Sequence, residues 1–143
     1  MGKKRIVKKG EENTGAEKSN APSKSSKKKV EHGVLYVQST YNNTTLLLTD
    51  KKGNALCATS SGALGFQGAK KGTPFAAAKA AEVLAEKAEI FGVKKVDVVV
   101  KGVGAGRESS IRGFISRGIQ LNTLKDMTPV PHNGPKPRKA RRV

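Results

Sequence analysis

Residues 33–60 read GVLYVQSTYNNTTLLLTDKKGNALCATS and are the most informative part of the chain about its fold. This stretch contains three runs rich in aliphatic, aromatic and β-branched residues, separated by two short polar segments. The runs are residues 34–40, 44–50 and 54–60. The first polar segment contains Asn42 and Asn43, which tolerate left-handed backbone angles, and the second contains Gly53. Strands joined by tight turns pair with each other, so the stretch predicts an antiparallel meander of three strands.

Beyond the meander, the chain continues with a loop and then a helix. Residues 61–72 contain four glycines and no hydrophobic periodicity, which predicts a loop. Thr73 and Pro74 form a helix start, because a threonine hydroxyl caps an unpaired amide and proline fits the first helical position. The predicted helix ends at Gly92, and its narrow, alanine-rich apolar face is suited to close packing on a sheet.

The rest of the domain alternates between strand and helix. A valine-rich run at 96–100 predicts a strand that is buried on both faces. A glycine turn follows at 102–106, and residues 107–117 predict a short helix with three large apolar residues turned inward. These are Ile111, Phe114 and Ile115. With a last strand at 119–125, the order is βββαβαβ, which indicates an α/β fold with two helices on a mixed sheet.

Positive charge is concentrated at the two ends of the chain. The 28 Lys and Arg residues against 11 Asp and Glu give a formal net charge of +17, but residues 30–132 hold only +5 of it. Residues 1–29 hold +7 and few large apolar side chains, which predicts a disordered basic arm. Residues 133–143 hold +5, and four prolines from Pro129 to Pro137 predict an extended tail. We therefore expect an arm (1–29), a domain (30–127) and a tail (128–143).

The composition favours a nucleic-acid partner over a membrane or an enzyme substrate. So much unbalanced charge calls for a polyanion, and no apolar run approaches the roughly 20 residues of a membrane-spanning helix. Cys57 is the only cysteine, interpreted as a core residue, and His32 and His132 are the only histidines, so no disulfide or metal site is expected. No activated nucleophile or acid pair is evident, so we expect no catalytic residue and no cofactor. With only 4% aromatic residues, contact with phosphates, sugars and RNA shape is favoured over base stacking.

Two segments combine glycine with positive charge. The glycine turn at 102–106 lies before a predicted helix and is followed by Arg107, which fits a phosphate site and a simple tight turn equally well. Lys70 and Lys71 precede the other helix, whose dipole adds to their charge, so RNA contact is favoured over a solvated loop. Phe66, in the same loop, fits either a stacking platform or a core residue.

Four motifs in order resemble one known family. They are Tyr41-Asn42-Asn43-Thr44, the segment from Gly65 to Ala77, the segment from Lys101 to Ser109, and the segment from Asp126 to Gly134. Together they are similar to the eleventh protein of the small ribosomal subunit, over about residues 33–143. The Pro-His-Asn-Gly ending resembles the bacterial branch of this family. The resemblance implies a ribonuclease H-like fold without nuclease activity.

The resemblance also implies a place in translation. It implies a structural protein on the platform of the 30S subunit, which binds 16S rRNA and helps form the cleft for the Shine-Dalgarno duplex. The implied location is cytoplasmic and ribosome-bound, with an organelle as the alternative compartment. The implied partners are 16S rRNA, the seventh, eighteenth and twenty-first small-subunit proteins, mRNA near that duplex and initiation factor three, with no membrane and no homo-oligomer. The implied rRNA-binding residues are Asn42, Asn43, Lys70, Lys71, Thr73, Arg107, Arg112, Asn133, Gly134, Lys136, Arg138, Lys139, Arg141 and Arg142.

The resemblance also concerns individual positions of the chain. It marks Asn133 as a site of isoaspartate formation, because Gly134 lets the next backbone nitrogen attack the side chain. Pro135 stands where the family commonly has cysteine, and Lys70 lies near a position where it often has arginine, whose forked contacts a lysine replaces with a point charge. Two other functions compete with this one: a nucleotide-dependent enzyme that uses the glycine turn and Asp126, and a free nucleic-acid chaperone.

Overall fold

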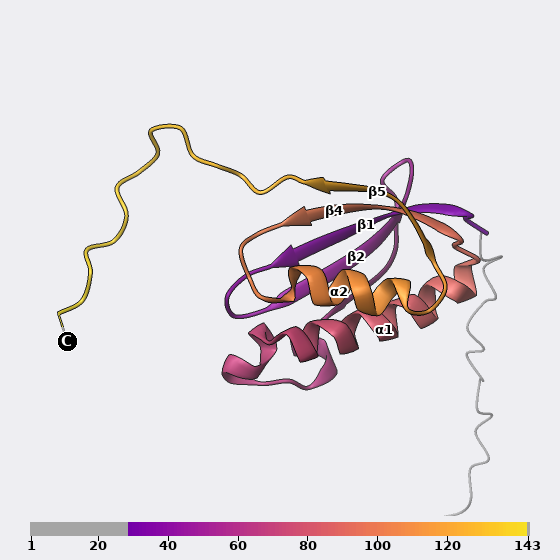
Figure 1. Cartoon of the computed structure of the whole chain (residues 1–143), viewed down its shortest axis with the longest axis horizontal. Helices are drawn as coiled ribbons and strands as arrows, with labels where there is room; N and C mark the ends of the chain where they lie inside the picture. The colour runs from indigo at the N-terminus through magenta and orange to yellow at the C-terminus, as the bar shows by residue number, and fades with distance from the viewer. Residues whose placement is uncertain (1–28, 143) are drawn as a thin grey trace, which may run out of the picture.

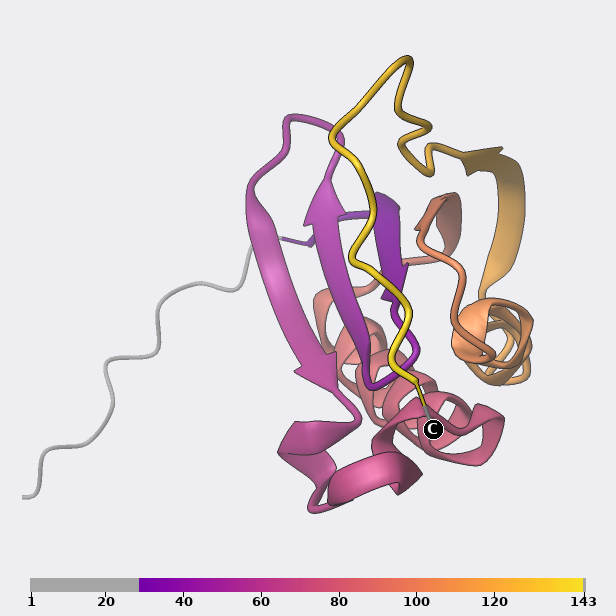
Figure 2. The same ribbon diagram turned by 90° about the vertical axis from the view of Figure 1, so that its left-hand side faces the viewer.

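The computed structural model describes residues 29–142, which form one five-stranded sheet with two helices on one face (Figures 1 and 2). Its elements are β1 (His32–Ser39), β2 (Thr44–Asp50), β3 (Ala55–Ser60), the 3-10 helices η1 (Gly62–Leu64) and η2 (Gly68–Gly72), α1 (Pro74–Phe91), β4 (Lys95–Lys101), α2 (Gly106–Ile115) and β5 (Gln120–Asp126). The predicted α/β class and the order βββαβαβ are confirmed. Of the predicted arm, only Lys29 falls within the described residues.

The sheet is mixed, as predicted, with the strand order β3-β2-β1-β4-β5. The meander of β1, β2 and β3 is antiparallel, whereas β4 pairs parallel with β1 and β5 pairs parallel with β4. Both parallel connections pass through a helix, and these helices cover the same face of the sheet. The strands β1, β4 and β5 therefore all end at the same edge of the domain (Figure 1).

The core lies between the sheet and the two helices. In β1, Leu35 and Val37 are buried and Tyr36 between them is exposed, as the two-residue period of a strand requires. Each aliphatic side chain buried in this way contributes roughly 1.5–3 kcal/mol. Small side chains of α1 face the sheet, as predicted, and Phe114 of α2 fills the space beside them. The buried residues of α1 are Ala76, Ala77, Ala80, Ala81, Leu84, Ala85 and Ala88.

The valines of β4 are buried on both faces of the strand, as predicted, although helices cover only one face of the sheet among the described residues. Within this part of the chain no helix lies over the face on which Val99 projects. Val99 is nevertheless only 9% exposed, because Tyr36 and Lys125 flank it in the register of the neighbouring strands. Burial of this side chain therefore comes from cross-strand neighbours rather than from a second layer.

Helix ends that rest on local signals are confirmed. The Thr73 hydroxyl accepts a hydrogen bond from the Ala76 amide at 3.3 Å, and Gly92 ends α1 with a left-handed φ of 76°. The second helix ends earlier than the predicted residue 117, at Ile115. Ile115 is consequently exposed at the helix end rather than turned inward, whereas Ile111 is partly buried against the core.

Two irregular segments also differ from prediction. The segment 61–72 is not a structureless loop, because η1 and η2 occupy most of it. In β5, the pairing with β4 skips Asn122, so that Leu121 pairs with Val96 and Thr123 with Asp97. This bulge accounts for the imperfect alternation of the strand. After β5, residues 127–142 form no helix or strand, as predicted for the tail.

Candidate nucleic-acid interface

Four segments that are distant in sequence meet at the edge where β1 and β4 end. They are the β1–β2 turn (40–43), the junction of η2 and α1 (70–73), the glycine turn (102–106) and the start of the tail (Figure 1). We call the first three segments the strand-end corner. It brings together Asn42, Asn43, Lys70, Lys71 and Thr73, five of the residues that the resemblance implies as rRNA contacts.

Glycines allow this corner to close. A Cβ on Gly72 would lie 2.1 Å from the Tyr41 carbonyl oxygen, and one on Gly104 would lie 2.2 Å from that of Thr40. Because these neighbours are backbone atoms, no side-chain rotation relieves the contact. The Gly104 amide donates to the Ser39 carbonyl at 3.0 Å. The glycine turn is therefore a tight packing turn, and this amide is not free for phosphate.

The β1–β2 turn is closed by Thr40 and Asn43. The Thr40 amide donates to the Asn43 carbonyl at 2.9 Å, and the Asn43 amide donates to the Thr40 hydroxyl at 3.1 Å. The predicted turn is confirmed, but neither asparagine has a positive φ, so their tolerance of left-handed angles is not what forms it. The Asn43 side-chain amide donates to the Thr45 hydroxyl at 3.4 Å, while its Oδ1 is buried without a hydrogen-bond partner among the described residues. Asn43 thus keeps one unused acceptor, and Asn42 is exposed.

Lys70 and Lys71 lie in η2, directly before α1. Within residues 29–142, neither ammonium group forms an ion pair. The Thr73 hydroxyl donates to the Lys70 carbonyl at 2.7 Å and caps α1, so its hydrogen is already used. Phe66 packs edge-on against Phe75, with ring centroids 6.1 Å apart, and is therefore neither a free stacking platform nor a core residue.

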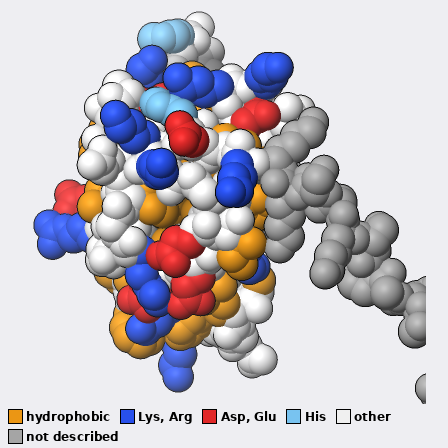
Figure 3. Space-filling view, turned by 90° about the vertical axis from the view of Figure 1, so that its right-hand side faces the viewer, with side chains coloured by type: hydrophobic (Ala, Val, Ile, Leu, Met, Phe, Trp, Pro, Cys, Tyr) orange, Lys and Arg blue, Asp and Glu red, His pale blue; other side chains and the backbone are white. Residues whose placement is uncertain are grey.

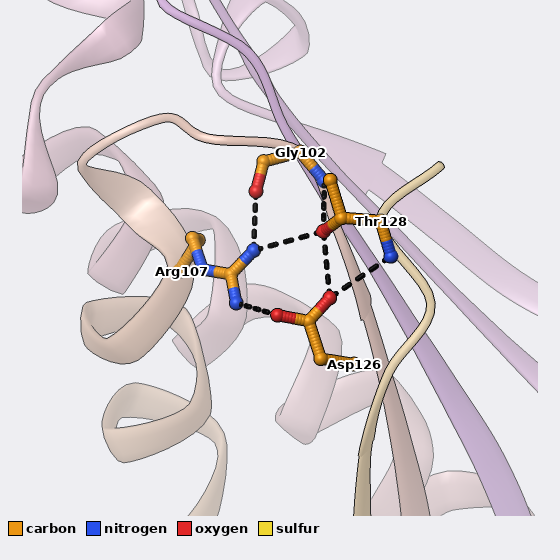
Figure 4. Close-up of polar contacts among 4 residues, drawn as sticks. All are labelled: Gly102, Arg107, Asp126 and Thr128. Atoms are coloured by element: carbon orange, nitrogen blue, oxygen red, sulfur yellow. Dashed lines mark hydrogen bonds and ion pairs between the residues drawn. The ribbon is translucent and has the colours of Figure 1, made fainter. Parts of the chain in front are cut away.

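The start of the tail is held by four residues that we call the tail clasp: Gly102, Arg107, Asp126 and Thr128 (Figure 4). Arg107 donates to the Gly102 carbonyl, to the Thr128 hydroxyl at 3.2 Å, and to the Asp126 carboxylate in an ion pair. The Asp126 carboxylate also accepts from the Thr128 hydroxyl at 2.6 Å and from its amide at 2.9 Å. Hydrogen bonds from Thr128 and from Arg107 lower the pKa of Asp126 to about 2.

The tail itself extends away from the domain (Figure 1). Residues 129–142 are exposed, and within the described part of the chain no hydrogen bond or ion pair joins them to the domain. Asn133 is the only described non-glycine residue with a positive φ, at 53°. The tolerance of asparagine for this conformation is therefore used in the tail and not in the β1–β2 turn. Isoaspartate formation at Asn133 stays a prediction.

A protein-family model described as ribosomal protein S11 matches residues 33–142. The chain belongs to the ribosomal protein S11 family. The match begins in β1 and runs to the last described residue, so it covers the sheet, both helices, the strand-end corner and the tail. As a member of this family, the chain is a structural protein of the small ribosomal subunit that binds rRNA.

The remaining implied contacts of this S11-family chain lie elsewhere. Arg112 is exposed on α2, 3.8 Å from the Glu108 carboxylate, and Arg107 is committed to the tail clasp. Thr128 has a central place in the clasp, yet sequence reasoning did not select it. The signal that could have found it is the spacing Asp-x-Thr, in which a carboxylate bonds the amide two residues on.

Other chemistry finds little support in the described residues. Asp126 forms an ion pair with Arg107, so its carboxylate is not free to bind a ribose hydroxyl, as the nucleotide-enzyme interpretation requires. Burial raises the pKa of Cys57, which packs half-buried against the core as predicted. Within residues 29–142, no three His, Cys, Asp or Glu side chains gather closely enough to hold a metal ion. Neither helix of this part combines the length and apolarity that a bilayer crossing requires.

Proposed function

We propose that this chain binds 16S rRNA on the platform of the 30S subunit through the strand-end corner and the tail. The observation that supports this most is the separation of charges. Lys70 and Lys71 lie beside Asn42 and Asn43 without an acidic partner in the described residues, and the five Lys and Arg residues of the tail have none either. Cations that no carboxylate neutralises are available to phosphate.

In this proposal the domain and the tail have different tasks. The corner offers lysine ammonium groups, the exposed side chain of Asn42 and exposed turn backbone, which suit the phosphates and 2′-hydroxyls of a folded RNA. The extended tail, from residue 128, reaches between RNA helices that a globular domain cannot enter. The direct contacts are Asn42, Asn43, Lys70, Lys71, Thr73, Arg112, Asn133, Gly134, Lys136, Arg138, Lys139, Arg141 and Arg142.

We further propose a bacterial-type role that is not enzymatic. The chain helps form the cleft for the Shine-Dalgarno duplex, in the bacterial cytoplasm. Its neighbours are the seventh, eighteenth and twenty-first small-subunit proteins, mRNA near that duplex and initiation factor three. The resemblance of the Pro-His-Asn-Gly ending to the bacterial branch supports this assignment.

Binding of the full chain to a platform segment of 16S rRNA, measured against salt concentration, tests the proposal. Replacing the five basic tail residues with glutamine should lower the slope of log K against log salt by about 3.5–4.5, since each lost phosphate contact removes about 0.7–0.9. The matched control replaces five basic residues at the other end of the sheet and should change the slope by less than about 1. Those residues are Lys51, Lys52, Lys87, Lys94 and Lys95.

Sedimentation of a cell extract separates the proposal from its alternatives. The chain should migrate with small ribosomal subunits, whereas a free chaperone would remain in the light fractions and bind unrelated RNAs equally. Equal loss of slope in the tail variant and in its control would show that only net charge matters. A binding constant that does not change with salt would reject the proposal.

A further inference from the structure

We infer that the tail clasp directs the basic tail onto RNA, so that Arg107 is a positioning residue and not an RNA ligand. This inference rests on the proposed function and deepens it, because it concerns how the tail reaches its phosphates. It gives Arg107, which the resemblance implies as an rRNA contact, a role inside the protein instead. The clasp joins three parts of the chain: the glycine turn, the first turn of α2 and the end of β5 (Figure 4).

The hydrogen-bond donors of Arg107 are largely used inside the molecule. One terminal nitrogen donates to the Gly102 carbonyl and to the Thr128 hydroxyl, and the other donates to Asp126. A terminal guanidinium nitrogen has two hydrogens, so the first of these nitrogens has none left. The Arg107 side chain is 31% exposed, against 84% for Arg112 on the same helix. Of these two arginines, Arg112 is the one placed to meet RNA.

The Thr128 hydroxyl is also fully engaged. It accepts from the Gly102 amide at 3.2 Å and from Arg107, and it donates to Asp126. A hydroxyl has one hydrogen and two lone pairs, so these three bonds satisfy it completely. One residue earlier, the Met127 amide donates to the Val100 carbonyl at 2.9 Å. The first two residues after β5 are therefore fixed to the domain by backbone and side chain together.

The attachment of Met127 and Thr128 to the domain also sets the direction in which the tail leaves it. Pro129 comes next, and a residue that precedes proline is held in an extended conformation. The chain thus leaves the clasp extended and in a set direction, at the edge where the strand-end corner lies (Figure 1). No further bond to the domain is made by residues 129–142 among the described contacts. A set direction raises the effective concentration of the tail near its RNA site, because fewer orientations are searched.

The negative charge of Asp126 allows an experiment to tell whether the clasp positions the tail. A carboxylate at the start of a basic tail repels phosphate, and Asp126, like any exposed aspartate, is charged at neutral pH. If the clasp had no role, removal of this charge would strengthen RNA binding. If the clasp directs the tail, replacing Asp126 with asparagine should weaken binding, because one carboxylate oxygen becomes an NH2 group that must face the donors of either Arg107 or Thr128. A clasp that directs the tail and a clasp without a role therefore predict opposite changes in RNA affinity for this variant.

The test measures binding of the full chain to the platform RNA segment for two clasp variants, D126N and T128V. We expect each to bind about five-fold more weakly, the factor that corresponds to ~1 kcal/mol for a small polar network. T128V changes no charge and nearly no volume, so it reports the lost hydroxyl alone. The matched control is E108Q, which removes an acid that is 86% exposed in the first turn of α2 and lies outside the clasp. E108Q should bind as the parent chain does or slightly more tightly.

A second comparison asks whether Arg107 acts through the tail. R107Q should weaken binding about five-fold in the parent chain, but by less than about 1.5-fold when the five basic tail residues are already glutamine, because two changes that act through one element are not additive. Equal losses in the two backgrounds would mean that Arg107 contacts RNA itself or only supports the domain, and would overturn the inference. Thermal unfolding of each variant shows whether the domain is intact.

The outcomes distinguish the inference from the proposed function. If the parent chain binds with the expected salt dependence and D126N binds as tightly or more tightly, the tail clasp has no positioning role although the function stands. If the parent chain itself fails to bind the RNA segment, the proposed function falls and the inference falls with it. Weaker binding by D126N and T128V, with E108Q unchanged, supports both.

Discussion

Both ends of the sheet carry basic residues, but lysines and arginines at one end are paired with acids, whereas Lys70 and Lys71 at the other end are not, among the described residues. At the end where β1 and β4 begin, Lys94 lies 3.5 Å from Glu31 and Arg117 lies 2.6 Å from Glu86. Figure 3 shows Lys and Arg side chains interleaved with Asp and Glu on this end. At the strand-end corner, Lys70 and Lys71 have no such partner in the described residues. The placement of the acids, more than that of the lysines, therefore marks the surface that phosphate can approach.

Two glycines from each end of the sheet differ in the reason that glycine is required. At the strand-end corner, Gly72 and Gly104 face backbone atoms so closely that no side chain fits. At the opposite end, Gly53 and Gly118 have positive φ values and open space around the missing Cβ. Gly72 and Gly104 are therefore required for close approach, and Gly53 and Gly118 for their backbone angle. The segments of the corner are thus packed backbone to backbone, a close arrangement that suits a protein that holds RNA helices in position.

Substitution of one glycine from each end should give the largest effect. Gly104→Ala places a Cβ 2.2 Å from the Thr40 carbonyl oxygen and 2.4 Å from the Ser39 hydroxyl. We expect it to lower the free energy of unfolding by roughly 3 kcal/mol, at the upper end of overpacking. Gly118→Ala meets no atom and should cost only about 1 kcal/mol, for a left-handed residue with a Cβ. Urea unfolding measures both, and similar losses would contradict the distinction.

Neutralising one lysine pair from each end should have the next largest effect, on RNA binding. Lys70→Gln with Lys71→Gln should weaken binding to the platform RNA segment about ten-fold and lower the salt slope by about 1.4–1.8, for two phosphate contacts. The control pair, Lys94→Gln with Lys95→Gln, removes the same charge from the opposite end. It should change affinity by less than about two-fold, because one of its members already has an exposed acidic partner. If the two pairs behaved alike, the corner would not be the binding surface.

Local signals predicted most of the fold. The Asn42-Asn43 and Gly53 turns set the meander, and Thr73 and Gly92 set both ends of α1, because caps and turns act within a few residues. The end of α2 was missed, and the burial of Val99 comes from cross-strand neighbours rather than from a second layer of helices. Hydrophobic periodicity within one segment shows neither where α2 ends nor which residues flank Val99.

The candidate site was predicted as a set of residues but not as an arrangement. Lys70 and Lys71 were selected from their charge and their place before a helix, and the asparagines from resemblance, but only the structure shows that Gly72 lies against Tyr41 and thereby joins them. The glycine turn fitted two interpretations, and the Ser39 carbonyl, which is distant in the chain, decided between them. The tail clasp was not foreseen, because Arg107 and Asp126 were assigned to different functions. Contacts between distant segments are what a single sequence leaves open.

The opposite end of the sheet has one acid with a structural task of its own. Asp97 of β4 accepts hydrogen bonds from His32 of β1 and from Asn122 and Thr123 of β5, all at 2.7 Å, and thereby ties the edge strand β5 to the sheet. The hydrogen bond with His32, followed by those with Thr123 and Asn122, lowers the pKa of Asp97 below its ordinary value of 3.8. A carboxylate with a lowered pKa in the folded state stabilises the protein above its unfolded pKa, and this contribution is lost as pH falls toward the folded pKa.

The smallest effect that we predict is the pH dependence of this contribution. Asp97→Asn should lower the melting temperature slightly at neutral pH, and the difference from the parent should shrink steadily below about pH 4. Glu31→Gln is the control, since its exposed pair with Lys94 should contribute almost nothing at any pH. A difference between parent and Asp97→Asn that stayed constant down to low pH would mean that the charge of Asp97 does not hold β5.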